Sequence, residues 1–308
     1  MMALPSQKNA PAAPAGSGPV TLPAAEQRAV FSRAGREYRI MIARPLNGAP
    51  SDAGGYPVLY ALDANACFAT LAPMVWSRSQ LADRATIAPA IVVGIGYPTE
   101  LPLDMVRRTY DYTPPADVLR LSPRPDGTPW PKTGGADEFL DFLAAELMPS
   151  IALEFSANPE RQALFGHSFG GLFALHALFT RPALFRHIIA ASPSVWWNER
   201  FILQAERAFS DRLRSSPIDA DVLVTVGSLE QQLTPFEEAA PDRDLRAQWK
   251  RQNRMLDNAR ELSGRLASLD RFGLRMTYTE FEGEDHGTVV PAALSRAVSF
   301  ALGKKVNR

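Results

Sequence analysis

The chain contains 308 residues, and 46% of them are hydrophobic, which is enough apolar material for a large folded core. Its 33 basic and 33 acidic residues cancel, so no global electrostatic field would attract nucleic acid or an anionic membrane. The single cysteine, Cys67, excludes an internal disulfide framework and a cysteine-rich metal site, and no apolar run reaches the roughly 18 residues of a transmembrane helix.

The opening of the chain predicts a disordered leader over residues 1–25, because it is rich in Ala, Pro, Gly and Ser and lacks the apolar core of a signal peptide. Two compartments stay open at this point: the periplasm if a signal peptide has been removed ahead of residue 1, and the cytoplasm otherwise. We expect residues 26–304 to form one domain.

The elements that follow alternate between strand and helix patterns. Alternation within residues 30–43 predicts a hairpin strand, and continuous apolar runs at 57–62 and 90–96 predict buried strands. Apolar residues at helical spacing predict a helix over 136–151. Later strands are predicted at 163–165, 188–192, 221–227 and 274–281. This order is typical of an α/β fold with a mostly parallel sheet that helices cover on both faces.

Two segments exceed that minimal layout. Residues 107–135 are rich in Pro and loop-like, and residues 231–270 form a long polar insertion with a helix expected from about Asp244. Both insertions begin at strand ends, where ligands bind in sheets of this kind. We therefore expect them to form walls of the site mouth rather than surface decoration.

The pentapeptide Gly166-His167-Ser168-Phe169-Gly170 has the G-x-S-x-G pattern. A bare match can be an ordinary turn, but here an apolar strand precedes it and a helix-forming segment over residues 171–179 follows it. A strand, a tight turn and a helix form the nucleophile elbow of an α/β-hydrolase. Ser168 is therefore the predicted nucleophile, and the predicted fold is the α/β-hydrolase fold.

A serine nucleophile needs a base within hydrogen-bond reach, and the chain has four histidines. His167 lies inside the elbow, where we expect its side chain to point away from the nucleophile. His176 and His187 are expected to be packing or surface residues. His286 lies on a polar loop directly after the last predicted strand, where α/β-hydrolases carry their base, so it is the predicted base.

The acid of a catalytic triad should lie between nucleophile and base in sequence, at a strand end. Glu230 meets that condition after the strand at 221–227, and its carboxylate would hold the tautomer of the imidazole. Glu284 and Asp285 are rivals, but a residue adjacent to His286 is poorly placed to reach beneath the ring.

An oxyanion hole needs two N–H groups directed at the developing charge. The backbone N–H of Phe169, which follows the nucleophile, is the first predicted donor. The second is expected from the loop after an early strand, at Ala64 or Asn65. Asp63 occupies the place where many lipases have the His of an H-G motif.

Five segments carry a resemblance that extends over residues 30–300. They are residues 58–65, 107–114, 166–171, 192–197 and 283–287. Among them, Arg-Arg-Thr-Tyr-Asp-Tyr-Thr-Pro at 107–114 and Ser-Pro-Ser-Val-Trp-Trp at 192–197 are the most specific. In these segments the chain resembles the esterase-D-like α/β-hydrolases, and within them the short-form enterochelin (trilactone siderophore) esterases.

The resemblance implies hydrolysis of the ester bonds of a cyclic catecholate trilactone, ferric or iron-free, with Ser168 as nucleophile and His286 as base. Some members of the group work with a Ser–His pair whose acid is displaced, which leaves the placement of Glu230 open. No cofactor and no protein-bound metal is expected, since any iron would arrive with the substrate and no His/Cys cluster suggests a metal site. The expected partner is a small ester, without nucleic acid, and the sequence indicates no oligomeric state.

A ferric tris-catecholate is a trianion with aromatic faces. Arg107 and Arg108, expected on a loop, could supply cations, and Trp196 or Trp197 could supply a stacking surface. The alternative is that one arginine pairs with Asp111 and one tryptophan lies in the core.

Two other functions remain open from the sequence. One is a general carboxylesterase or acyl-thioester hydrolase of the acetyl-xylan, feruloyl or S-formylglutathione type. The other is a catalytically inactive siderophore-binding protein, which the ordered Ser, Glu and His residues disfavour.

Overall fold

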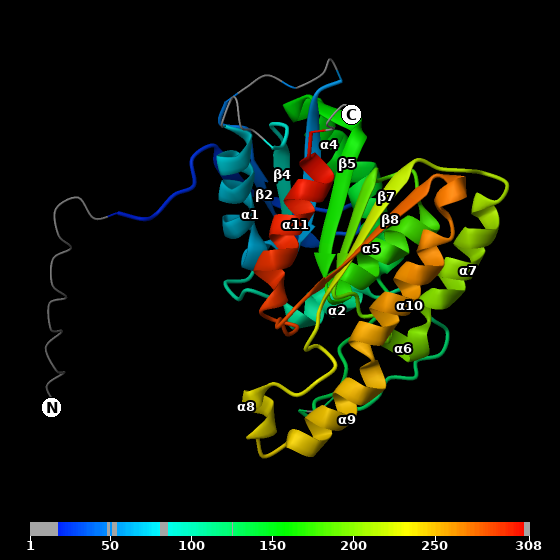
Figure 1. Ribbon diagram of the computed structural model, residues 1–308. Coiled ribbons are helices and arrows are strands. Elements are labelled where there is room, and N and C mark those ends of the chain that lie inside the picture. Colours follow the sequence, from blue (N-terminus) through cyan, green and yellow to red (C-terminus); the bar gives the residue numbers. More distant parts are fainter. Residues whose placement is uncertain (1–17, 48–49, 51–53, 81–85, 125, 305–308) are drawn as a thin grey trace, which may run out of the picture.

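The computed structural model describes residues 18–47, 50, 54–80, 86–124 and 126–304. Most of the predicted leader, residues 1–17, therefore lies outside the described residues. The described chain forms one eight-stranded sheet with helices on both sides (Figure 1). The strands are β1 (Ala25–Phe31), β2 (Glu37–Ala43), β3 (Tyr56–Leu62), β4 (Ile91–Gly96), β5 (Ala157–His167), β6 (His187–Ala191), β7 (Ala220–Gly227) and β8 (Leu274–Phe281).

The strand order across the sheet is β1-β2-β4-β3-β5-β6-β7-β8. The β1–β2 and β2–β4 pairs are antiparallel, and all pairs from β4 to β8 are parallel. The loops that leave the parallel strands therefore meet along one edge of the sheet, where ligands bind in open α/β folds. The predicted α/β-hydrolase fold is confirmed.

The helices divide between the two faces of the sheet. They are α1 (Ala64–Ser79), α2 (Met105–Tyr112), α3 (Ala136–Phe142), the π-helical η1 (Leu143–Leu147), α4 (Met148–Phe155), α5 (Phe169–Thr180), α6 (Trp197–Arg200), α7 (Ile202–Leu213), α8 (Pro235–Glu238), α9 (Arg243–Asn253), α10 (Met255–Ala267), the 3-10 turn η2 (Asp270–Phe272) and α11 (Val289–Leu302). Helices α1 and α11 pack on one face, and α5, α7 and α10 pack on the other (Figure 1).

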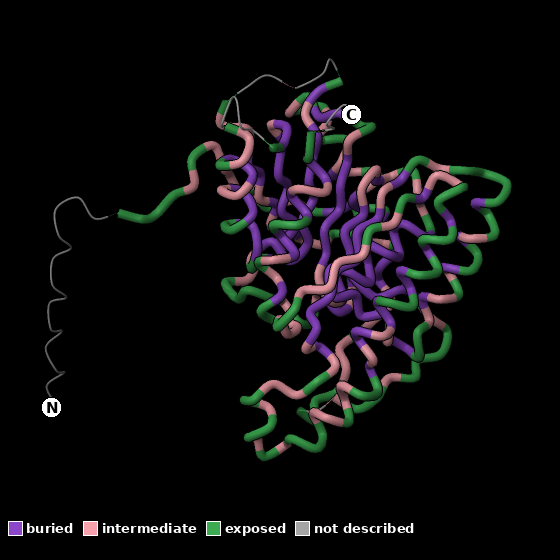
Figure 2. Tube along the Cα trace, in the orientation of Figure 1, coloured by how far each residue is buried: buried purple, intermediate pink, exposed green. Residues whose placement is uncertain are grey.

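Strand β3 shows why the sheet is buried on both faces. Val58, Tyr60 and Leu62 belong to the core on the α5 side, and Leu59 and Ala61 belong to the core on the α1 side. Successive side chains of a strand point to opposite faces, so a continuous apolar run fills two cores at once. Figure 2 shows the buried strands between exposed helix surfaces.

The predicted strands and the helix predicted from residue 136 lie where the sequence pattern placed them, with three main differences in length. The first strand of the hairpin predicted over 30–43, β1, begins five residues earlier at Ala25. Strand β5 begins six residues before the predicted run, and α3, η1 and α4 continue without a break to Phe155. The second insertion contains α8, α9 and α10, and the left-handed Arg254 (φ 47°) separates the last two. Helices α8 and α9 project beyond the sheet edge as a separate lobe (Figure 1).

The first insertion was predicted to be loop-like from residue 107, and that prediction is wrong for α2. The side chain of Asp104 accepts hydrogen bonds from the N–H groups of Val106 (3.2 Å) and Arg107 (2.9 Å). Two otherwise unsatisfied donors of the first turn are thereby paired, which stabilises a helix of only eight residues. From Thr113 to Gly135 the described residues of the insertion contain no helix or strand.

Candidate active site

The nucleophile elbow is formed at the junction of β5 and α5. Ser168 has φ 61° and ψ −117°, a conformation that a non-glycine residue adopts only under strain. Its N–H donates to the carbonyl of Ala191 (2.9 Å) in the neighbouring strand, which holds the turn against β6. A Cβ atom on Gly166 would lie 2.1 Å from the carbonyl oxygen of Gly170, so only glycine permits so tight a turn.

Glu230 and His286 meet beside the elbow. Glu230 Oε2 lies 2.6 Å from Nδ1 of His286, and the carboxylate is fully buried. Its other oxygen accepts from the hydroxyl of Ser192 (2.5 Å) and the N–H of Gly227 (2.7 Å). A carboxylate with these partners fixes Nδ1 of His286 as the protonated nitrogen and leaves Nε2 as the acceptor.

The rival acid Asp285 has a different role in the structure. Its carboxylate accepts from the N–H groups of Gly287 (2.7 Å) and Thr288 (2.9 Å) at the entrance to α11. The hydrogen bond from the N–H of Thr288, with those from the N–H of Gly287 and the side chain of Thr288, holds the pKa of Asp285 below its ordinary range despite partial burial. Asp285 therefore orders the loop of His286 rather than its ring.

Ser168 and His286 line the same cavity. The hydroxyl of Ser168 lies 3.4 Å from the hydroxyl of Ser194, and within the described chain no hydrogen bond joins Ser168 to the ring of His286. Catalytic hydrogen bonds are often long before a substrate is bound and shorten when it arrives.

His167, expected to point away from the nucleophile, does not line the cavity, but its ring lies beside the predicted base. Its ring centroid lies 4.6 Å from that of His286, because His167 ends β5 at the edge where the loop of His286 passes. Burial, together with the neighbouring ring of His286, holds the pKa of His167 well below its usual value, so it stays neutral. His176, hydrogen-bonded to Asp137 (2.7 Å), and His187, beside Asp221, lie outside the site as expected.

Of the predicted oxyanion donors, only Phe169 lines the cavity. It is the first residue of α5, where the N–H has no acceptor within the helix. The side chain of Asn65 instead bonds the backbone of Tyr97 and Thr99, and neither Asn65 nor Ala64 is on the cavity wall. The second oxyanion donor, predicted at the backbone of Ala64 or Asn65 after β3, stays a prediction.

The cavity beside Ser168 has a volume of about 460 Å³, and both insertions contribute to its wall, as expected. Three tryptophans from separate segments meet there: Trp130 of the first insertion, Trp196 after β6, and Trp249 of α9. Their ring centroids lie 5.3–6.3 Å apart, and Phe169 joins them at 5.8 Å from Trp196. We call these four residues the aromatic wall.

The sequence did not single out Trp130 and Trp249. The available signal was a large aromatic side chain in a Pro-rich loop and another on a polar helix, where neither has a core to fill. Their meeting depends on how the two insertions fold toward each other.

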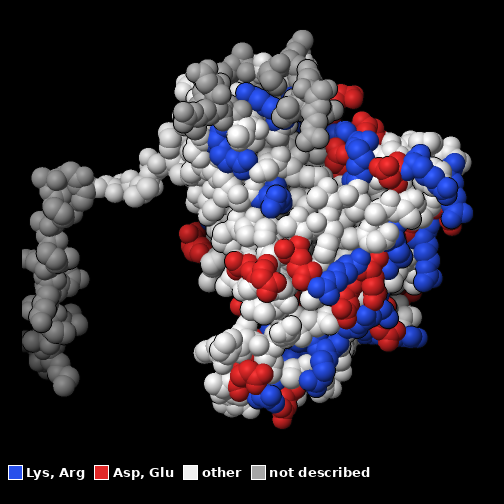
Figure 3. All heavy atoms as spheres, in the orientation of Figure 1, with Lys and Arg blue, Asp and Glu red and all other residues white. Residues whose placement is uncertain are grey.

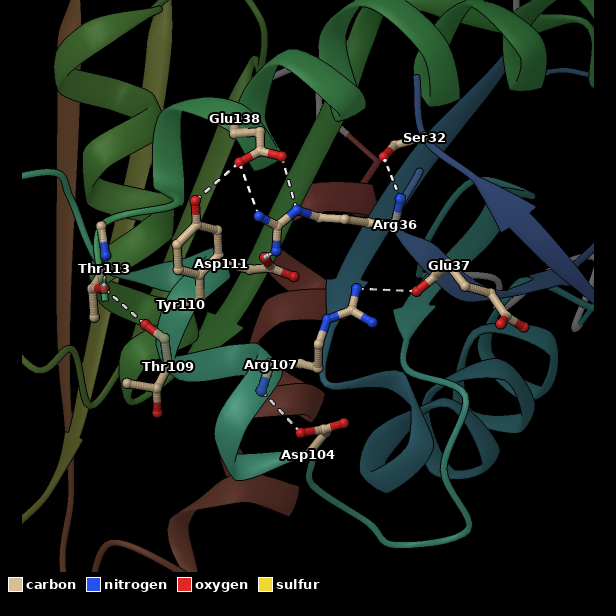
Figure 4. A network of polar contacts seen from close by, with 11 residues as sticks. Ser32, Arg36, Glu37, Asp104, Arg107, Thr109, Tyr110, Asp111, Thr113 and Glu138 are labelled. Atoms are coloured by element: carbon tan, nitrogen blue, oxygen red, sulfur yellow. Dashed lines mark hydrogen bonds and ion pairs between the residues drawn. The ribbon is translucent and has the colours of Figure 1, made fainter. Parts of the chain in front are cut away.

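Two predicted substrate contacts are wrong. Trp197 is fully buried in the core and does not line the cavity. Arg107 is not on the cavity wall and donates instead to the carbonyl of Glu37 (3.1 Å; Figure 4). Its guanidinium also lies over the rings of Tyr38 and Tyr97. Successive residues of a helix point about 100° apart, so Arg107 faces the sheet when Arg108 faces the cavity.

Arg108 lines the cavity and forms two hydrogen bonds with the carboxylate of Asp63 (3.0 and 2.9 Å). Asp63 adopts a left-handed conformation (φ 53°) at the end of β3, at the turn where the sequence placed the oxyanion loop. Both side chains are at least nine-tenths buried, so the guanidinium is held in one orientation beside the elbow.

Among the described residues, no group of three His, Cys, Asp or Glu side chains is placed to hold a metal ion. None of the helices within the described ranges is long and apolar enough to cross a membrane.

Comparisons with known proteins show which family the chain resembles. The family model Esterase matches residues 32–261. The ferri-bacillibactin esterase BesA of Bacillus subtilis is 39% identical over 93% of this chain and 92% of its own length. The siderophore enterobactin esterase of Emericella nidulans is 38% identical over 92% of this chain and 96% of its own length.

A solved structure shares the fold closely. The crystal structure of the BES protein from Bacillus cereus superposes with a TM-score of 0.80 at 37% identity, covering 94% of this chain and 99% of that one. The match to the family model and these relatives together identify the chain: it belongs to the Esterase family, and it is a carboxylic ester hydrolase with the α/β-hydrolase fold.

Proposed function

We propose that this enzyme hydrolyses the ester bonds of a cyclic catecholate trilactone siderophore, with Ser168 as nucleophile, His286 as base and Glu230 as the acid that orients the base. The observation that carries the proposal is the contact of 2.6 Å between the buried carboxylate of Glu230 and His286, in the wall of an aromatic-walled cavity that Ser168 also lines. The named activities of the two relatives, on ferri-bacillibactin and enterobactin, support the substrate class.

The proposed reaction has two halves. The oxygen of Ser168 attacks the ester carbonyl carbon while Nε2 of His286 takes the hydroxyl proton, and the N–H of Phe169 stabilises the oxyanion. The carbon–oxygen bond of the ester then breaks, and His286 returns its proton to the leaving alcohol. A water molecule, deprotonated by His286, releases the acyl group from Ser168 in the same way.

The aromatic wall suits the arms of such a substrate. Catechol rings are flat and aromatic, and they would stack on the indole faces of Trp130, Trp196 and Trp249. Arg108, fixed by Asp63, would present its guanidinium to the polar oxygens of the trilactone near the scissile bond.

The test is chromatographic product analysis of enterobactin after incubation with the purified enzyme and with the Ser168→Ala variant. We expect linear trimer, dimer or monomer to appear with the wild type alone. An intact trilactone, together with wild-type turnover of simple aryl esters, would instead indicate a general carboxylesterase.

A further inference from the structure

The turn Ser192-Pro193-Ser194, which follows β6, carries two hydroxyls beside the catalytic cavity. Basic and acidic side chains are interspersed on the face of the molecule in Figure 3, but these two serines are hidden from solvent, with Ser192 fully buried and Ser194 only 1% exposed. Ser194 nonetheless lines the cavity. Buried hydroxyls need hydrogen-bond partners, and the partners of these two show what the turn does.

The backbone holds this turn against the nucleophile elbow. Ser192 has φ 43°, in the left-handed region, and its N–H donates to a carbonyl of β7 (2.7 Å). The N–H of Ser194 donates to the carbonyl of Ser168 (3.1 Å). A Cβ atom on Gly171 of α5 would lie 3.0 Å from Cα of Pro193, so the first turn of that helix packs closely on the same segment. Both serine side chains therefore start from fixed points beside the elbow.

The two hydroxyls contact different members of the proposed triad. The hydroxyl of Ser192 donates to the carboxylate of Glu230 (2.5 Å). The hydroxyl of Ser194 lies 3.4 Å from Oγ of Ser168, which is its only hydrogen-bond partner within the part of the chain that the structure describes. Ser192 therefore acts on the acid, and Ser194 contacts the nucleophile itself.

The proposed reaction determines which of the two serine hydroxyls donates. Ser168 has a single hydroxyl proton, and that proton passes to Nε2 of His286 during the attack. In the same step Oγ of Ser168 can only accept from Ser194, which keeps its own proton throughout. The hydrogen of the Ser194 hydroxyl is therefore directed at the reacting oxygen.

A donor at this position acts more on the transition state than on the free enzyme. A separation of 3.4 Å between two neutral hydroxyls makes a weak hydrogen bond. As the proton of Ser168 leaves, negative charge develops on Oγ, and a hydrogen bond to a charged oxygen is shorter and about twice as strong. Because only interactions that strengthen in the transition state accelerate the chemical step, this contact favours catalysis.

The same contact serves both halves of the reaction. In the first half Oγ of Ser168 forms a bond to the ester carbonyl carbon as its proton moves to His286. In the second half that bond breaks, its electron pair returns to Oγ, and His286 gives the proton back. Oγ carries partial negative charge in both transition states, so a donor beside it stabilises both.

We propose that Ser194 is a further catalytic residue, whose hydroxyl donates to Oγ of Ser168 and stabilises the charge that develops there in attack and in release. This role rests on the proposed function, because it requires Ser168 to be the nucleophile.

The test measures how fast a fluorophosphonate phosphonylates Ser168 in the wild type and in Ser194→Ala, with mass spectrometry to locate the label. A phosphorus–oxygen bond forms at Oγ, the phosphorus–fluorine bond breaks and fluoride leaves, so the rate reports on the nucleophile without a siderophore. We expect the rate constant to fall about 10- to 100-fold, because a hydrogen bond to a charged oxygen is lost. On a chromogenic ester, kcat should fall by a similar factor, while KM stays within about twofold.

The matched control is Ser263→Ala, which removes another buried serine hydroxyl. Ser263 bonds the carbonyl of Ala259 within α10 (2.7 Å) and is not on the cavity wall, so its variant should phosphonylate at the wild-type rate. In Ser194→Ala the pH at which kcat/KM falls on the acid side should match that of the wild type, because the contact between Glu230 and His286 is untouched.

Ser194→Cys repeats the test should Ser194→Ala fold poorly, since a thiol is close in size but a weak donor, and its phosphonylation should fall about threefold or more. Phosphonylation at the wild-type rate in the folded variants would overturn the role of Ser194 and leave the proposed function standing. A loss that moves the acid side of the pH profile, or that Ser263→Ala shares, would overturn that role as well. A wild type whose Ser168 is not phosphonylated would overturn the proposed function, and the role of Ser194 with it.

Discussion

At the scale of single residues, the environment of Glu230 requires a side chain that can accept hydrogen bonds at both of its terminal atoms. Both carboxylate oxygens accept hydrogen bonds, from Ser192 and Gly227 on one and from His286 on the other. An amide cannot reproduce this pattern, because whichever way it is turned its NH₂ group faces a donor.

Glu230→Gln should therefore lower kcat by about 10²- to 10⁴-fold, since the tautomer of His286 is no longer fixed and its protonated form is no longer stabilised. The measurement is steady-state kinetics on a chromogenic ester, with circular dichroism to verify folding.

Asp285→Asn is the matched control, because this neighbouring carboxylate binds the backbone of Gly287 and Thr288 instead of the ring. It should retain kcat within a few fold. Nearly full kcat in Glu230→Gln, or a loss confined to Asp285→Asn, would remove Glu230 from the proposed triad.

The residues of this site differ in how far the sequence could predict them. Ser168, Glu230 and His286 each follow a strand in the order expected of the fold, so local patterns sufficed to nominate them, and the structure brings Glu230 and His286 into contact. The directions of Arg107 and Arg108 could not be predicted, because they depend on a helix that the sequence pattern did not indicate.

At the scale of elements, α2 was missed for a physical reason. A helix of eight residues is too short to be stable alone, so its formation depends on the Asp104 cap and on packing against α3 and α5. The buried strands depended less on such context, because β4 is a short apolar run rich in β-branched residues and ends at a glycine, a combination that favours a strand over a helix. The aromatic wall is the extreme case, since Trp130 and Trp249 meet only after two insertions have folded.

The first insertion is held in place by one side chain in particular. Asn198, left-handed at φ 46°, accepts from the N–H of Arg120 (2.6 Å) and donates to the carbonyl of Val118 (3.0 Å). Asn is among the few residues that tolerate this conformation, and here its amide also pairs the backbone of a segment without regular structure. Because Trp130 donates to the carbonyl of Ser122, two residues after Arg120, Asn198 helps to hold Trp130 in place.

Asn198→Ala should therefore destabilise the protein by about 1–3 kcal/mol and raise KM for the trilactone more than it lowers kcat. Urea unfolding and steady-state kinetics measure the two effects.

Glu199→Ala is the control, because Glu199 reaches the same loop through an exposed ion pair with Arg120 (3.2 Å) and such pairs contribute little. Equal effects of the two substitutions, or a loss in kcat alone for Asn198→Ala, would contradict a role for Asn198 in holding this wall.

At the scale of the whole molecule, buried titratable groups give stability two opposed dependences on pH. Burial lowers the pKa of His187 to about 4, and burial also holds the pKa of His167 well below its usual value. Burial raises the pKa of Asp111 to about 6, despite the nearby Arg107 and Arg36 (Figure 4).

The signs follow from proton binding. Between about pH 4 and 6.5 the unfolded chain binds more protons at the two histidines than the folded protein, so their contribution makes the protein more stable as pH rises. Between about pH 4 and 6 the folded protein binds more protons at Asp111, so that contribution makes it less stable as pH rises. Two histidines outweigh one carboxyl, and stability should increase from pH 4 to 6.5.

Asp111→Asn removes the opposing contribution, so the free energy of unfolding should rise more steeply with pH in the variant than in the wild type. The difference between the two proteins should change by about 2 kcal/mol from pH 4 to 7 in favour of the variant, since one pKa unit corresponds to about 1.4 kcal/mol and part of the shift is already expressed at pH 4. Urea unfolding at half-unit pH steps measures the free energy of unfolding of each protein. The His187→Gln variant should behave in the opposite way, because it lacks a group that makes stability increase with pH, so its free energy of unfolding should rise less steeply with pH than that of the wild type. Parallel profiles for wild type and Asp111→Asn would show that Asp111 ionises in the folded protein as it does in the unfolded chain, with Arg36 and Arg107 offsetting its burial in full.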